Sequence, residues 1–373
     1  MDLTLSSADR VLAEEFRAWL ADNLVLPSPF SSLDDEVDWG RRWQRRLAEG
    51  RWVGVSWPRA VGGQGATPLE VALVNVEYAR SRAPQPVNRV GLNLAGPTLL
   101  AHGTTEQQVR WLPPLLRADE LWCQLFSEPG AGSDLASLVT QAVAVDGGFR
   151  LTGQKVWTSY AQHARWGICL ARTDPASPRH RGLSYLVVDM TAPGVTVRPL
   201  VQLTGDAEFS ETWLDDVFVP ADQLVGGLGE GWRVANTTLA HERGTTFPFK
   251  EQVVHEVAMA RVLESAVRSG ALDDPLLADE LAACFVELRL LALHNLRTLT
   301  ALGQGREPGA ESSWVKLTWS AMTQHLSAVA LQIDPADPLV QRQFLWSGAA
   351  GIAGGTSEVQ RTIIGERVLG LPR

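Results

Sequence analysis

The chain has 373 residues, 45% of them hydrophobic, and a formal net charge of -9 at pH 7. A chain of this length exceeds the usual size of one domain, so we expect two or three packed lobes. The acidic balance argues against nucleic-acid binding, which needs a basic face to neutralise phosphates.

The sequence carries no signal for a membrane or for an oxidising compartment. It has no run of about 18 uncharged apolar residues, and Met1 to Thr4 lack the basic and apolar stretches of a secretory signal. Its three cysteines, Cys123, Cys169 and Cys284, are too few and too far apart for a disulfide framework or a CxxC metal site. We therefore expect a cytoplasmic protein with no membrane span and no bound metal.

The first part of the chain reads as helical. Ser6 or Ser7 is a helix start signal, and Val11, Phe16 and Leu20 follow at roughly helical spacing. Proline and glycine then divide the region into short helices. We predict an N-terminal helical domain over residues 1–120.

From residue 121 to 228 the pattern changes to short β-rich runs. Val143 and Val145 alternate with alanines before the turn Asp146-Gly147-Gly148, which predicts a hairpin. Further strands are expected at residues 166–171, 183–188, 195–200 and 212–219. These runs predict a β domain with an antiparallel sheet or barrel.

Helical patterns return in the predicted third domain, residues 229–373. A glycine-rich loop at 348–355 precedes a last helix that begins at Thr356 or Ser357, with Ser357 and Gln360 as a capping box. The order of helices, strands and helices predicts an α+β fold, because a parallel sheet would show βαβ alternation.

Two segments carry the most specific pattern. Residues 125–137 contain Pro129-Gly130-Ala131-Gly132-Ser133, and residues 151–159 contain Trp157. Glycines let a backbone approach a diphosphate, hydroxyl and N–H groups donate to its oxygens, and an indole packs on an isoalloxazine. The first segment alone reads as an ordinary turn. A nicotinamide-binding fingerprint is disfavoured, because Leu135 stands where the third glycine belongs.

A third segment, residues 353–361, places glycines directly before the last predicted helix. A helix N-terminus behind glycines suits an anionic or polar cofactor edge. By itself, the segment is equally an ordinary glycine-rich loop followed by a capped helix.

Together the three segments resemble the signatures of the acyl-CoA dehydrogenase family, and looser matches extend the resemblance to nearly the whole chain. The resemblance implies FAD as cofactor, a middle antiparallel β-barrel or sheet domain and a C-terminal four-helix bundle. It also implies α,β-dehydrogenation of an acyl thioester, on CoA or an acyl carrier, to the trans-2-enoyl thioester. The β-hydrogen is then accepted as a hydride at N5 of FAD.

Members of the family differ in which position carries the catalytic base. In many family members the carboxylate that takes the α-proton immediately precedes the Gly-Thr of the C-terminal loop, and this chain has Gly354 there. The isovaleryl and long-chain branches carry their glutamate in a Glu-Arg pair on a helix, which corresponds to Glu242 and Arg243. Glu242 is therefore the candidate base.

Helical spacing supports Glu242 independently. It falls on the stripe of Trp232, Ala235 and Leu239, whereas His241 points almost the opposite way. The alternative is that Glu242 makes a structural ion pair with an arginine elsewhere.

The resemblance also assigns the remaining contacts. The positions that contact FAD correspond to Gln124, Phe126, Ser127, Gly132, Ser133, Trp157, Ser159, Thr356 and Glu358. The positions that contact substrate correspond to Ser133, Arg243 and Gly354, and the Gly354 N–H polarises the thioester carbonyl together with the flavin ribityl group.

The assembly is implied less directly. The resemblance implies electron-transfer flavoprotein as electron acceptor and a homotetramer or homodimer. Many family members have an Arg-x-x-Phe-Gly segment that reaches the FAD of a neighbouring subunit, and this chain has no counterpart. A heteromer, in which another chain supplies that contact, is therefore open.

Two other functions remain open. The first is a flavin oxidase or monooxygenase of the same fold, acting on a nitroalkane or an amine. The second is a non-catalytic subunit that completes the flavin site of a partner chain.

Overall fold

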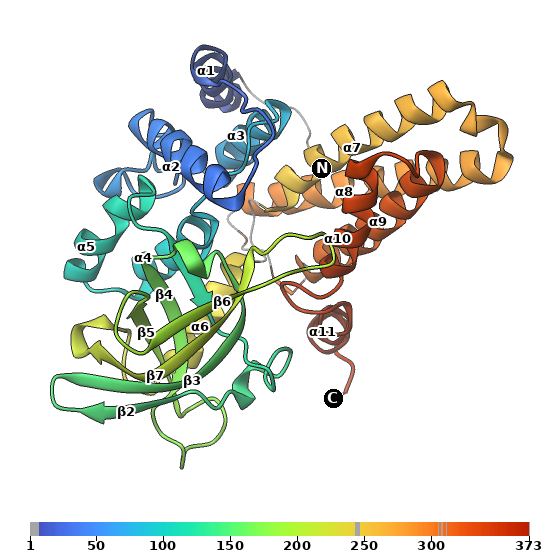
Figure 1. The fold of residues 1–373 in the computed structure, drawn as a ribbon. Helices are drawn as coiled ribbons and strands as arrows, with labels where there is room; N and C mark the ends of the chain where they lie inside the picture. Colours follow the sequence, from blue (N-terminus) through green and yellow to red (C-terminus); the bar gives the residue numbers. More distant parts are fainter. Residues whose placement is uncertain (1–6, 243–246, 305, 307–308, 311, 373) are drawn as a thin grey trace. The chain divides into compact units, whose positions relative to one another are not determined.

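The computed structural model describes residues 7–242, 247–304, 306, 309–310 and 312–372 (Figure 1). Its helices are α1 Ser7–Asn23, α2 Leu33–Glu49, α3 Pro68–Arg80, α4 Gly96–His102, α5 Thr105–Leu116, α6 Gly231–Glu242, α7 Phe247–Ser269, α8 Pro275–Gly303, α9 Ser312–Ile333, α10 Pro338–Ala350 and α11 Ser357–Ile363. Its strands are β1 Trp122–Leu125, β2 Gln141–Val145, β3 Gly148–Ser159, β4 Trp166–Arg172, β5 Leu183–Asp189, β6 Val195–Leu200, β7 Phe209–Pro220 and β8 Leu224–Val225. This content confirms the predicted α+β class.

The chain divides into two compact units, each assembled from separate stretches of sequence. The sheet unit comprises Pro27–Gly65 and Pro84–Glu242. The bundle unit comprises Met1–Leu26, Ala66–Ala83 and Arg243–Arg373. The three predicted domains, which follow chain order, stay a prediction.

The sheet unit contains an eight-stranded sheet in the order β6-β7-β3-β2-β4-β5-β8, with β1 paired to β4. The predicted hairpin is β2–β3, and Gly147 in its turn has a φ of +75°. The four other predicted strands are confirmed as β4, β5, β6 and β7.

The expectation of an antiparallel sheet needs one correction. β1 pairs with β4 in parallel, and the first residue of β2 also pairs with β4 in parallel. A parallel pair needs a long connection between its strands, and the β2–β3 hairpin supplies that connection between β1 and β4.

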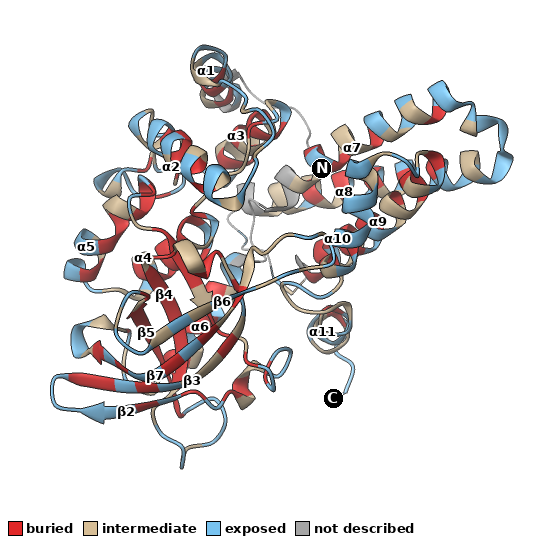
Figure 2. Ribbon diagram, viewed as in Figure 1, coloured by how far each residue is buried: buried red, intermediate tan, exposed pale blue. Residues whose placement is uncertain are grey.

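The apolar core of this unit is built by residues from the strands of the sheet. β4 and β5 are buried along almost their whole length (Figure 2). Their inward residues pack with those of β1, β3 and β7, and examples are Cys123, Leu151, Cys169, Leu186 and Val217. Two of the three cysteines are therefore core residues.

Helix α6 packs on β4 and β5. Its buried residues are Gly231, Val234, Ala235 and Thr238, whose spacing of three and four residues defines one helical face. A Cβ at Gly231 would lie 2.5 Å from backbone atoms of Ser184, so glycine permits this close approach to β5. The sheet thereby fixes the helix that ends at Glu242.

In the bundle unit, α7, α8 and α9 pack against one another and α10 packs on α9, which confirms the predicted C-terminal four-helix bundle. Residues such as Met259, Leu281, Cys284, Met322 and Leu326 form its core. Helices α1 and α3 belong to the same unit, and α3 contacts α7 and α8. No helix in the described ranges is long and apolar enough to cross a membrane.

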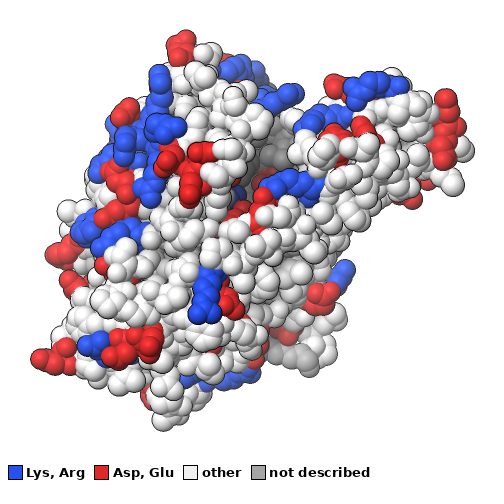
Figure 3. Space-filling view, viewed as in Figure 1, with Lys and Arg blue, Asp and Glu red and all other residues white. Residues whose placement is uncertain are grey.

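Acidic and basic side chains are interspersed over the face drawn in Figure 3. The arginines of α2 illustrate the pattern. Arg41 donates to the Ala118 carbonyl at 2.9 Å, and Arg45 pairs with Asp119 at 2.7 Å. The arginine-rich run of α2 therefore makes contacts within the sheet unit.

Candidate active site

The first predicted cofactor segment begins in β1 and continues as a closed turn. Gln124 and Ser127 are half-buried, whereas Phe126 is buried with its ring 5.8 Å from that of Tyr185 in an edge-on arrangement. Glu128 and Ala131 exchange both backbone hydrogen bonds at 3.0 Å. The turn is therefore fixed by its own backbone.

The glycines of this turn border open space. Gly130, Gly132 and Ser133 are exposed, and a Cβ built on either glycine would meet no atom within 4 Å. Nothing in the chain's own packing demands glycine here. The space suits a ligand that approaches the backbone closely, as a diphosphate does.

The second predicted segment is the end of β3, where a bulge lies between Lys155 and Thr158. Within it, Trp157 has a φ of +61° and is 61% exposed, and Ser159 is half-buried. A bulky residue with positive φ is a conformational outlier, and a large exposed apolar side chain is unusual when it packs on little. Both features indicate that the chain holds the indole outward for a ligand.

A backbone hydrogen bond joins the two segments. The Val156 N–H donates to the Ser127 carbonyl at 2.9 Å. Residues far apart in the sequence thus form one surface at the ends of β1 and β3.

A buried ion pair underlies this surface. The Lys155 Nζ, which is fully buried, lies 2.9 Å from Oε1 of Glu128 and also donates to the carbonyls of Phe126 at 3.0 Å and Leu170 at 2.8 Å. The Glu128 carboxylate accepts from the N–H groups of Val139 and Thr140 at 2.7 and 2.9 Å. Burial raises the pKa of Glu128, but Lys155 and these donors outweigh it and hold the pKa below its ordinary value.

Sequence reasoning did not single out Lys155 or Glu128. The available signal was a lysine inside a β-rich run and a glutamate directly after a strand. The spacing of the two residues in the sequence does not indicate that they form a pair. Only the fold shows that they are in contact.

Glu242 is the last residue of α6, one turn after the buried Thr238. The Thr238 hydroxyl lies 2.8 Å from that of Thr98 and 3.1 Å from that of Tyr185. The Glu242 side chain and the whole of Arg243 lie outside the described residues.

The predicted stripe of α6 needs one adjustment. Ala235 is buried as expected, but Trp232 and Leu239 are half-buried, so the centre of the buried face runs through Val234 and Thr238. His241 is exposed, as predicted.

The C-terminal loop belongs to the bundle unit. Gly354 and Gly355 have φ values of +67° and +93°, a region that favours glycine. The buried Gln360 side chain donates to the carbonyls of both at 3.2 and 3.3 Å. Gly354 is thereby held in a defined conformation.

The cap of α11 differs from the prediction. Thr356 is the N-cap, and its hydroxyl accepts from the Val359 N–H at 3.2 Å. Ser357 and Gln360 do not form a capping box, because Gln360 is occupied by the glycine carbonyls. Glu358 lies exposed in the first turn, where backbone N–H groups and Thr356 lower its pKa.

The predicted residues therefore fall into two sets. The sheet unit contains the end of α6 and also Gln124, Phe126, Ser127, Gly132, Ser133, Trp157 and Ser159. Gly354, Thr356 and Glu358 lie in the bundle unit. The sheet-unit set has the features that an FAD needs, namely open backbone at glycines, hydroxyl donors and an outward indole.

Comparison with known proteins agrees with this fold. The acyl-CoA dehydrogenase N-terminal, middle and C-terminal domains match residues 6–119, 123–217 and 229–369. The acyl-CoA dehydrogenase IpdE1 of Mycobacterium tuberculosis is 41% identical over 96% of this chain and 98% of its own length.

Two solved structures are also similar. The Tcur3481-Tcur3483 steroid ACAD has a TM-score of 0.85 at 28% identity and covers 100% of both chains. The ChsE4-ChsE5 complex from Mycobacterium tuberculosis has a TM-score of 0.83 at 28% identity, again over 100% of both chains.

The chain belongs to the acyl-CoA dehydrogenase family. It is an FAD-dependent enzyme of the acyl-CoA dehydrogenase class.

Proposed function

We propose that the chain oxidises an acyl-CoA to the trans-2-enoyl thioester, with Glu242 as the base that removes the α-proton. The observation that carries the proposal is the junction of the two cofactor segments, where the Val156 N–H donates to Ser127 and Trp157 is exposed beside it. A flavin at this junction packs on the exposed indole of Trp157. Such a contact accounts for the strained backbone conformation of this residue.

The chain's own groups have distinct roles in the proposed reaction. FAD, when bound, supplies an acceptor for the β-hydrogen as a hydride. The Glu242 carboxylate takes the α-proton, and Gly354 supplies a backbone N–H to the thioester oxygen, which gains negative charge. Arg243 contacts the substrate. Glycine at 354 keeps the N–H donor although it removes the carboxylate found there in many relatives.

The cofactor contacts divide by chemistry. Ser127, Ser133 and Ser159 supply hydroxyl donors, Gly132 supplies open backbone, and Trp157 supplies an aromatic face. Gln124 and Phe126 frame the same surface. The Thr356 hydroxyl, which accepts from Val359, and Glu358 in the same turn are the proposed contacts from the C-terminal loop.

We further propose a bulky, steroid-type acyl group as substrate. The support is the likeness over the full chain to a steroid ACAD. CoA is the proposed carrier because the relative of 41% identity is named an acyl-CoA dehydrogenase.

For the assembly, we propose a complex with a second chain of the same fold. The likeness to the ChsE4-ChsE5 complex and the lack of an Arg-x-x-Phe-Gly segment both support a heteromer. A homotetramer or homodimer is the alternative, and electron-transfer flavoprotein in the cytoplasm is the proposed electron acceptor.

Anaerobic titration of the purified holoenzyme with straight-chain, branched, aromatic and steroid-linked acyl-CoAs tests the function. Bleaching of the flavin absorbance by a thioester, with formation of the enoyl product, is the expected result. The steroid-linked thioester should bleach at the lowest concentration.

Two outcomes would overturn the proposal. Rapid reoxidation of the flavin by oxygen, with no bleaching by any thioester, would indicate an oxidase or monooxygenase. A complex with a companion chain that dehydrogenates the thioester equally well with Glu242→Gln and with Glu242 would indicate that this chain is a non-catalytic subunit.

A further inference from the structure

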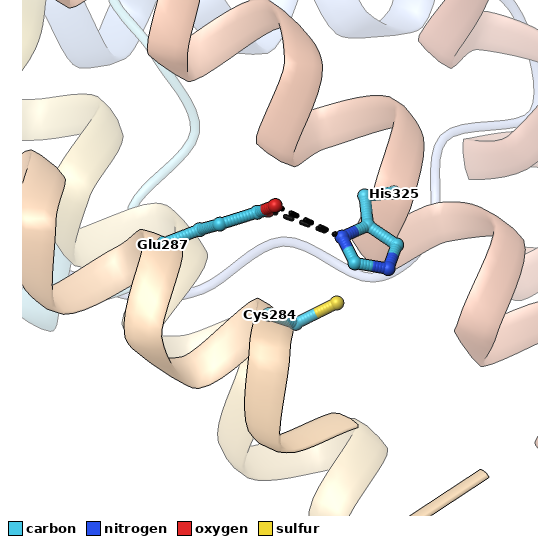
Figure 4. A group of neighbouring side chains, drawn as sticks. All are labelled: Cys284, Glu287 and His325. Atoms are coloured by element: carbon cyan, nitrogen blue, oxygen red, sulfur yellow. Dashed lines mark hydrogen bonds and ion pairs between the residues drawn. The ribbon is translucent and has the colours of Figure 1, made fainter. Parts of the chain in front are cut away.

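A cluster of potential metal ligands lies between α8 and α9 of the bundle unit (Figure 4). Cys284, Glu287 and His325 each offer one ligand atom, and these atoms lie within 4.8 Å of one another. Within the described ranges this is the one group of three such side chains that meets this spacing. None of the three belongs to the predicted flavin or substrate contacts.

The helices explain why these side chains meet. Glu280, Cys284 and Glu287 are spaced by four and three residues, so they share one face of α8. α9 packs against that helix, and His325 lies between Met322 and Leu326, which are core residues. The core packing therefore holds the imidazole opposite the cysteine and the two glutamates.

The imidazole is oriented by a carboxylate at each nitrogen. Nε2 of His325 lies 2.6 Å from Oε2 of Glu280, and Nδ1 lies 3.1 and 3.2 Å from the two oxygens of Glu287. A metal-binding histidine usually donates its other N–H to a carboxylate, which fixes the tautomer. If Glu280 accepts from Nε2, the lone pair of Nδ1 faces Glu287, and the three ligand atoms lie within 4.8 Å of one another.

We propose that Cys284, Glu287 and Nδ1 of His325 bind a zinc ion, with Glu280 holding the imidazole and a water completing the coordination. A mixed set of thiolate, imidazole and carboxylate ligands suits zinc, which accepts four tetrahedral ligands of these kinds. The side chains of Glu287 and His325 are 36% and 26% exposed, so solvent reaches the cluster and an ion can enter.

The experiment uses the untagged holoenzyme, treated with EDTA and then dialysed against zinc chloride. We expect about one zinc per chain by mass spectrometry of the metal content, and a zinc–sulfur distance of about 2.3 Å by X-ray absorption. Cys284→Ser and His325→Gln should lose the tightly held zinc. Glu280→Gln, which keeps all three ligands, should bind zinc about 10–100-fold more weakly.

His294→Gln is the matched control, because His294 is a half-buried histidine of α8 outside the cluster. It should retain zinc as the unchanged protein does. Zinc retention by His325→Gln equal to that of the unchanged protein, or zinc bound without a sulfur neighbour, would overturn the proposal. Glu280, Glu287 and His325 would then be an ion-pair cluster that joins two helices. If His325→Gln fails to fold, the zinc affinity of Glu280→Gln still tests the proposal.

Discussion

Lys155 and Glu128 form an ion pair with 2.9 Å between Nζ and Oε1, and both side chains are buried beneath the two cofactor segments. Lys155 also bonds the Phe126 carbonyl, and it lies two residues before Trp157. The pair therefore links the turn after β1 to the bulge in β3. It is the structural support of the proposed flavin surface.

The first prediction concerns this pair. Lys155→Met leaves the Glu128 carboxylate buried without its cation, so we expect a loss of about 3–5 kcal/mol in the free energy of unfolding. The protein should also retain less FAD, because the turn and the bulge lose their common anchor. Urea unfolding and the ratio of flavin to protein absorbance measure the two effects.

Arg45→Met is the matched control, since Arg45 pairs with Asp119 at 2.7 Å but is 50% exposed. This substitution should lower the free energy of unfolding by about 1 kcal/mol or less and leave the FAD content unchanged. If both variants lose the same stability and the same amount of FAD, the buried pair of Lys155 and Glu128 contributes no more than an exposed ion pair.

The second prediction concerns the exposed indole. Trp157→Ala should change the stability of the flavin-free protein little, because the side chain is 61% exposed and its ring contacts that of Phe209 edge-on at 6.1 Å. FAD affinity should fall about tenfold, which corresponds to ~1.4 kcal/mol of lost ring packing. Equilibrium dialysis with FAD measures the affinity.

Trp213→Ala provides the comparison, since Trp213 is 41% exposed in the neighbouring strand β7. Its removal should leave FAD affinity unchanged. If both variants bind FAD as the unchanged protein does, Trp157 has no part in the flavin surface.

The third prediction concerns pH and the bundle unit. The hydrogen bond from Arg17, followed by the positive charges of Arg17 and Arg80, holds the pKa of Glu77 below its ordinary value although burial opposes this. A depressed folded pKa adds stability above the unfolded value of about 4.3, and this stability disappears as the pH falls through the folded pKa. Glu77→Gln should therefore unfold more easily than the unchanged protein at pH 7 but not at pH 3.

Thermal unfolding at the two pH values measures the difference. The expected size is about 1 kcal/mol at neutral pH, because Arg17 and Arg80 are largely exposed. Glu264→Gln, an exposed site on α7, should show no such pH dependence. A Glu77→Gln variant with the same deficit at both pH values would point to lost packing and not to charge.

Much of the sheet was predictable because its strands are short β-rich runs separated by turn residues. β6 matches its predicted run, residues 195–200, and the β2–β3 hairpin forms at the predicted glycine turn. The parallel partnership of β1 was not predictable, since nothing in a four-residue strand identifies a partner that follows a whole hairpin.

The site was predictable only where its residues lie in one continuous stretch of the sequence. The glycine turn and the Trp157 strand are continuous segments, so their pattern was visible. Lys155 with Glu128, and Cys284 with His325, depend on pairs from different elements. The proposed metal site takes its ligands from two helices, so the spacing of the cysteines in the sequence could not indicate it.

The account's central claim is that this flavoprotein removes an α-proton with Glu242. Rapid anaerobic mixing of Glu242→Gln with the acyl-CoA that bleaches the unchanged enzyme most readily tests it most directly, provided that the variant holds FAD to the same extent. We predict that bleaching slows by about 10²–10⁴-fold, while Glu264→Gln bleaches at the original rate. Bleaching of Glu242→Gln at the original rate would contradict the claim.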